Sequence, residues 1–320
     1  MHLVDFKVTR KAGRRGVALL CLGLSHAALP AVITNGFDLT DTLIPVDQIH
    51  HGGPPRDGIP AIDNPQFLAV KQAVSLADTD RVLGVRQNGV AKAYPIRILN
   101  YHEIVNDKFG SDGVVVSYCP LCGTGMAFSA DIDGRTRSFG VSGLLYNSDV
   151  LFYDRETESL WSQILTKAVS GSMRGTKLKL LATTHTTWRD WRTRHPDTVV
   201  LSEATGHRRD YSRTPYVGYE TSDQVYFPVS NVNRKYHPKE LVIGLTVQDQ
   251  HKVYPFAELS KAASPIDDQF AGREFRIEFD ASNRSGRVLD AEGMEVPTVI
   301  AYWFAWVGFH PETEIFEPRE

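Results

Sequence analysis

Two cysteines three positions apart are the residues whose type and spacing most clearly suggest chemistry. Cys119 and Cys122 lie in the run Tyr118-Cys119-Pro120-Leu121-Cys122-Gly123. In such a turn at the end of a strand, backbone N–H groups can point at both sulfurs. Thiolates stabilised in this way are good ligands for soft or borderline metal ions. The run therefore predicts a metal-binding turn.

Two other interpretations of the pair have to be weighed. A thioredoxin-like redox pair needs a helix after its first cysteine, and Gly123 and Gly125 make a poor helix start. A plain disulfide, or two inert buried thiols, stays open because an unliganded pair this close tends to oxidise in an oxidising compartment.

The remaining ligands must come from elsewhere in the chain. His102 is the preferred candidate, because a helix beginning at Pro95 places it on the inward stripe with Ile98 and Leu99. His310 is a second candidate. Two thiolates and one imidazole favour copper as the cofactor, with zinc as the alternative.

Such a centre predicts a metalloenzyme of oxidoreductase type whose open coordination position takes water or a small-molecule substrate. A metal carrier that hands over its ion without catalysis is one alternative. A scaffold held by a structural disulfide is the other.

The N-terminus has the parts of a secretory signal peptide. Arg10, Lys11, Arg14 and Arg15 precede the apolar run 16–24, and small residues follow up to Ala27. A signal peptide over residues 1–27 predicts a periplasmic or secreted protein whose mature chain has lost Cys21. No other segment is apolar enough to be an integral membrane span. The net charge of -3 gives no reason to expect nucleic acid as a partner.

An internal repeat organises the rest of the chain. The blocks 82–85 and 92–95 recur at 242–245 and 252–255, an offset of 160, and the block 156–158 recurs at 312–314, an offset of 156. Each copy opens with a hairpin, and Asn88-Gly89 predicts a two-residue turn. Ala262 and Asp280 stand in the second copy where His102 and Cys119 stand in the first, so only the first copy is expected to hold the site.

These patterns predict an α+β fold, mainly antiparallel β, made of two pseudo-repeated β-rich units with short helices. The expected order is an extended N-terminal arm (28–79), a first repeat with the thiol site (80–170), a connecting helix and long loop (171–237) and a second repeat (238–320).

Several longer motifs resemble a bacterial domain-of-unknown-function family, number 3179. They include the runs 53–60, 100–103, 118–124 and 139–149. The resemblance implies an exported protein with a shared site near the thiols, but it lends no established activity. Within these runs, Tyr118, Asn147, Ser148 and Asp149 are candidate catalytic residues. For the last three a polar β-turn is an equally simple explanation.

Overall fold

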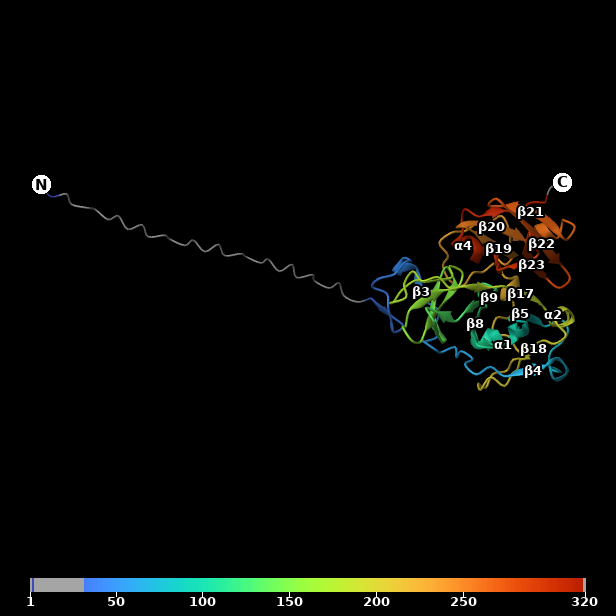
Figure 1. Ribbon diagram of the computed structural model, residues 1–320, viewed down its shortest axis with the longest axis horizontal. Helices are drawn as coiled ribbons and strands as arrows, with labels where there is room; N and C mark the ends of the chain where they lie inside the picture. The colour runs from blue at the N-terminus through green and yellow to red at the C-terminus, as the bar shows by residue number, and fades with distance from the viewer. Residues whose placement is uncertain (1, 3–31, 319–320) are drawn as a thin grey trace. The chain divides into compact units, whose positions relative to one another are not determined.

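Strands dominate the part of the chain that the computed structural model describes, which is His2 and residues 32–318. The composition is 41% strand and 12% helix, and five sheets of four or five strands are arranged as the blades of a β-propeller (Figure 1). The predicted α+β fold of two repeated units is therefore wrong. Residues 3–27 of the predicted signal peptide lie outside the described residues. None of the described helices is long and apolar enough to cross a membrane.

The blades are numbered here in the order in which their central hairpins occur along the chain. Blade 1 contains β17 (Thr183–Thr187), β5 (Arg81–Gln87), β6 (Val90–Pro95), β18 (Val199–Leu201) and β4 (Phe67–Ala69), in that order. Blade 2 contains β16 (Leu180–Leu181), β9 (Thr124–Ser129), β8 (Asp112–Cys119) and β7 (Ile104–Phe109). Blade 3 contains β15 (Lys167–Ala168), β14 (Leu160–Ser162), β13 (Asp149–Asp154), β12 (Phe139–Tyr146) and β3 (Ile49–His51).

Blades 4 and 5 are formed by the last third of the chain. Blade 4 contains β25 (Val299–Tyr302), β19 (Leu241–Val247), β20 (Gln250–Pro255) and β26 (Glu314–Ile315). Blade 5 contains β21 (Ile266–Phe270), β22 (Arg273–Asp280), β23 (Ser285–Asp290) and β24 (Glu295–Val296). Two small hairpins are β1 (Ile33–Thr34) with β2 (Phe37–Asp38) and β10 (Asp131–Ile132) with β11 (Arg135–Thr136).

The helices are short and connect strands. They are α1 (Ile96–His102), α2 (Trp188–Arg194), α3 (Phe256–Leu259) and α4 (Trp303–Phe309), with 3-10 turns η1 (Val46–Gln48), η2 (Val70–Gln72) and η3 (Tyr219–Thr221). The segment predicted as an extended arm supplies β3 to blade 3 and β4 to blade 1.

The predicted turn between β5 and β6 is confirmed. Asn88 and Gly89 have φ values of 52° and 76°, and the strands pair antiparallel up to Gln87 and Val90. Positive φ at both central residues is what a two-residue hairpin turn of this kind requires.

Blades 1 and 4 resemble each other locally. In each, an antiparallel hairpin is flanked by a parallel strand, and a tryptophan from the second helix after the hairpin lies on a glycine of the first hairpin strand. Trp191 covers Gly84 and Trp306 covers Gly244. The indole N–H of each tryptophan donates to a threonine seven residues later, Thr198 at 2.8 Å and Thr313 at 3.1 Å.

Blade 3 accounts for the change in offset along the two related halves of the chain. The hairpins of blades 1 and 4 are 160 positions apart, whereas Trp191 and Trp306 are 115 apart, so the first half carries 45 extra residues. Most of blade 3 lies in this insertion, between β9 and β17. The predicted match of the block 156–158 with 312–314 is wrong, because the first block connects β13 to β14 in blade 3, whereas the second leads from α4 into β26 of blade 4.

The tryptophan–glycine contacts give a test of this packing. A Cβ at position 244 would lie 2.1 Å from the ring of Trp306. We expect Gly244→Ala to lower the free energy of unfolding by about 1–3 kcal/mol or more, because overpacking forces the ring or the strand to move. Urea unfolding measures the change. The matched control is Gly308→Ala in α4, where the nearest atom lies at 3.7 Å and stability should be kept or raised.

Candidate metal centre

The turn that carries the two thiols lies where three blades meet. β8 ends at Cys119, which pairs with Thr124 at the start of β9, and the Cys122 N–H donates to Cys119 O at 3.2 Å. Tyr302 N of blade 4 donates to Cys122 O at 2.8 Å. Gly123 has a φ of 60°, and a Cβ there would lie 2.8 Å from the Tyr302 ring, so this position requires glycine. Both cysteines are free thiols and are buried.

Blade 3 brings a carboxyl group to the thiols. Asn147 and Ser148 form the turn between β12 and β13, with φ values of 50° and 64°, and Asp149 follows as the first residue of β13. One side-chain oxygen of Asp149 and the two sulfurs all lie within 4.8 Å of one another. The thiol of Cys122 donates to Ser148 O at 3.2 Å, and that of Cys119 lies 3.8 Å from the same oxygen. The run 147–149 is thus a polar turn that also contacts the thiols.

Buried polar atoms without hydrogen-bond partners gather at this place. Among the described residues they include Asp149 Oδ1, Ser148 Oγ, Gln163 Oε1 and Tyr219 OH. The other oxygen of Asp149 accepts from Ile164 N at 3.2 Å, and the Gln163 amide donates to Ser117 Oγ at 3.0 Å. An unsatisfied buried polar group costs about 1–3 kcal/mol. A cation would pair the Asp149 oxygen, so the donor set fits a metal ion.

The electrostatics also favour a bound cation. Burial raises the pKa of both thiols, and it raises the pKa of Asp149 to about 7, while the nearby thiols lower that pKa by a smaller amount. Burial, together with the charge of Asp149, raises the pKa of Glu103 to about 8. Without a positive charge these groups hold protons, because a charged form is poorly solvated in the interior.

His102 does not converge with the thiols. Its Nδ1 lies 2.8 Å from Pro60 O, which can only accept, so Nδ1 carries the proton. Its Nε2 then accepts from Tyr211 OH at 2.6 Å. Both ring nitrogens are occupied. The inward side chains of α1, such as Leu99, share an apolar cluster with Tyr118, on the face of β8 opposite to Cys119. The predicted convergence of His102 with the two cysteines is therefore wrong, and the third potential donor that lies near both sulfurs is Asp149.

The end of α1 instead anchors a segment that covers the site, which we call the strap (residues 205–221). Tyr211 OH lies 2.6 Å from Thr205 Oγ1, Tyr101 OH donates to Arg213 O at 3.1 Å, and Asn100 Nδ2 donates to Thr214 Oγ1 at 3.4 Å. Further along the strap, Tyr219 is buried in the same apolar cluster as both cysteines. His102 therefore contacts the segment that covers the thiols, and does not contact the thiols themselves.

The other predicted site residues lie apart from the three donors or serve packing. His310 stacks on His251 with ring centroids 3.8 Å apart, and burial lowers its pKa to about 3. Tyr118 belongs to a different apolar cluster from Cys119, because adjacent residues of β8 face opposite sides of the sheet. Asn147 Nδ2 donates to Gly308 O at 3.0 Å, and its Oδ1 accepts from Ser230 N at 2.7 Å.

Sequence reasoning missed three neighbours of the thiols: Glu103, Gln163 and Tyr219. Glu103 directly follows the histidine that was singled out, and it has a strained φ of 56°. Gln163 directly follows β14 in blade 3, and its amide also lies 3.3 Å from Thr124 O. Nothing in the local sequence around Tyr219 indicates that its hydroxyl is buried near the thiols.

One known protein family matches most of the chain. The family described as "Protein of unknown function (DUF3179)" matches residues 56–313. The chain belongs to this family. The match includes the thiol turn, the turn before β13, the strap and the hairpins of blades 1 and 4. No curated protein and no solved structure matches the chain.

The buried carboxyl group predicts an unusual pH dependence. Asp149 binds its proton more tightly in the folded protein (pKa about 7) than at its ordinary value of 3.8. The metal-free protein should therefore lose stability as the pH rises from about 4 through 7, by up to about 4 kcal/mol for such a shift. Asp149→Asn should remove this loss, so the variant gains stability over the wild type at pH 8 and not at pH 4. Urea unfolding in the presence of a chelator measures both.

The control for this test is Asp267→Asn. Its hydrogen bond with Arg276 lowers the pKa of Asp267, so that change should cost stability at pH 8 and not at low pH. An Asp149→Asn variant that is destabilised equally at both pH values would contradict the burial argument.

The anchoring of the strap gives a second prediction. His102→Gln and Tyr211→Phe each weaken a hydrogen bond worth about 1 kcal/mol, so opening of the strap should become about fivefold more frequent. The reaction of the two thiols with an aromatic disulfide reagent should accelerate to the same degree in the metal-free protein. His51→Gln, on an exposed residue of β3, is the control and should react at the wild-type rate. Unchanged rates in both strap variants would show that the thiols are reached by another route.

Proposed function

We propose that this protein binds one thiophilic metal ion through Cys119, Cys122 and Asp149. The observation that carries the proposal is the convergence of three donor groups within 4.8 Å, one of them a buried carboxyl group that has an oxygen without a partner. Cysteine sulfur and aspartate oxygen are both common ligands of zinc. Three protein ligands leave a fourth position for water or a substrate.

The change of the third ligand shifts the preferred metal. Copper was favoured because an imidazole and two thiolates suit Cu(I), whereas a carboxylate is a harder ligand. Zinc accepts sulfur and oxygen together, so we propose zinc, with copper as the alternative. If the ion is copper, an oxidoreductase reaction follows naturally. If it is zinc, the ion would act as a Lewis acid on a small molecule.

The burial of the donors favours a resident ion over a carrier function. A carrier that hands over its ion is expected to expose its ligands, yet Cys119 and Cys122 are 1% and 0% exposed. Ser148 Oγ and Tyr219 OH are buried nearby and have no partner among the described atoms, so they are available to orient a molecule at the fourth position. This arrangement supports a metalloenzyme as the leading proposal and a carrier as the second.

Export belongs to the same proposal. The basic flank and apolar run of residues 1–27 support a periplasmic or secreted location. Two free thiols this close would tend to form a disulfide in an oxidising compartment. A bound ion would protect the two thiols from forming that disulfide.

Elemental analysis of the full chain, expressed with its own leader and purified from the exported fraction, tests the proposal. One equivalent of zinc or copper is expected. Cys122→Ser and Asp149→Asn should each weaken metal binding by more than about 100-fold, because each removes a direct ligand. Loss of a residue that only supports a ligand already lowers metal affinity by about 10–100-fold. His102→Gln is the matched control and should keep one equivalent. A disulfide between Cys119 and Cys122 in protein isolated with both metals present would refute the proposal.

A further inference from the structure

In the described part of the chain, blade 4 has no counterpart of the strand that completes blade 1. In blade 1 the outer edge of β18 pairs antiparallel with β4, with Val200 opposite Leu68 and Leu201 opposite Phe67, and Ser202 N donates to Gln66 O at 2.7 Å. In blade 4 the corresponding strand is β26, and within residues 32–318 no strand pairs with its outer edge. The two blades otherwise have the same strand order and directions.

The backbone of β26 presents a free donor on this edge. Phe316 N donates inward to Val253 O at 2.9 Å. Because N–H groups alternate along a strand, the N–H of Ile315 points outward. The same alternation holds in β18, where Ser202 N points outward to the arm. The edge of β26 therefore has the pattern that an added strand needs.

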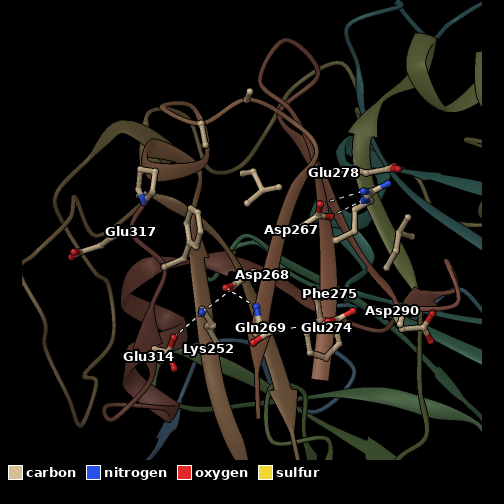
Figure 2. A pocket seen from close by; sticks show the side chains of 18 of the residues that line it. Lys252, Asp267, Asp268, Gln269, Glu274, Phe275, Glu278, Asp290, Glu314 and Glu317 are labelled. Atoms are coloured by element: carbon tan, nitrogen blue, oxygen red, sulfur yellow. Dashed lines mark hydrogen bonds and ion pairs between the residues drawn. The ribbon is translucent and has the colours of Figure 1, made fainter. Parts of the chain in front are cut away.

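A hollow of about 1370 Å³ lies beside this edge. Figure 2 shows side chains that line it. One wall is the segment from Glu314 to Pro318, and the opposite wall is formed by β21 and β22. Apolar side chains line part of it, including Phe275, Ile266 and Phe316. In blade 1 the corresponding outer edge is covered by β4.

A buried lysine indicates what the missing strand should carry. Lys92 of blade 1 pairs with Asp107 at 2.9 Å, and its Nζ lies 4.3 Å from the ring centre of Phe67 in β4. Lys252 of blade 4 pairs with Asp268 at 2.7 Å and with Glu314 at 2.6 Å, but its nearest ring centres, Tyr254 and Phe270, lie at 5.7 and 5.9 Å. An aromatic side chain on the added strand would fill the place that Phe67 fills in blade 1.

The charge of the hollow indicates which side chains an added strand should carry near its ends. Seven of its lining residues are acidic and three are basic. Two of the basic side chains, Lys252 and Arg276, are already paired within the hollow. Figure 2 labels Glu274 and Asp290, which have no ion-pair partner among the described residues, whereas Glu317 pairs with Lys235 outside the hollow. The surface therefore favours basic side chains.

We propose that the outer edge of β26 binds an extended basic segment of a partner protein as a fifth antiparallel strand, with an aromatic side chain over Lys252. Recognition by strand addition combines backbone hydrogen bonds with pockets for alternate side chains. This surface does not involve the thiols, so the proposal is independent of the metal centre.

The probe is a synthetic peptide that copies residues 64–72 of this chain, extended by two lysines at each end and labelled for fluorescence polarisation. It should bind the full-length protein at one site, and binding should weaken as salt rises. A peptide with alanine in place of the phenylalanine should bind about tenfold more weakly.

Two protein variants make the test specific. Ile315→Pro removes the outward N–H and no bond within the sheet, and it should weaken binding about five- to tenfold. Glu274→Lys with Asp290→Lys should weaken it further and reduce the salt dependence. Glu292→Lys, on an exposed residue outside the hollow, is the control. Absence of binding, or equal binding by wild type and both variants, would overturn the proposal. A dimer in sedimentation that Ile315→Pro abolishes would also overturn it, because the occupant would then be a second copy.

Discussion

The burial of two thiols beside a carboxyl group with one unpartnered oxygen is the constraint on which the centre of this protein depends. Cys119, Cys122 and Asp149 come from two blades, and the backbone of a third blade fixes the turn between the cysteines. In the interior their charged forms are disfavoured, so each group either keeps a proton or pairs with a cation. The proposed function rests on the second state, in which the unpartnered oxygen of Asp149 and the two sulfurs would share one cation.

Blade 3 is what makes such a centre possible in one half of the chain. The hairpins and the tryptophan–glycine contacts of blades 1 and 4 correspond closely, and the 45 extra residues of the first half contain most of blade 3. Asp149, Ser148 and Gln163 all lie in this insertion. The asymmetry between the halves therefore arises from an added blade. The presence of His102 in the first half, where the second half has Ala262, is a secondary difference.

Two surfaces of the molecule differ in how completely they are covered. The thiols lie beneath a strap that Asn100, Tyr101 and His102 hold by hydrogen bonds, so a stretch that suggested a ligand has a positioning role. At blade 4 no strand within residues 32–318 pairs with the corresponding outer edge, whereas β4 pairs with that edge in blade 1. The described part of the N-terminal arm supplies β4 to the edge of blade 1 and pairs with no strand of blade 4.

The sequence alone determined the hairpin turn at Asn88-Gly89, the β-rich character of the chain and the position of the thiols at the end of a strand, because these depend on residues close together in the chain. The motifs also identified the family, and they singled out Asp149 without giving it a ligand role. Tertiary structure decided the five-bladed arrangement, the separation of His102 from the thiols and the approach of Asp149. Those outcomes depend on which sheets pack together. The sequence could not predict them, because the periodicity of a strand indicates which face is buried but not what lies against that face.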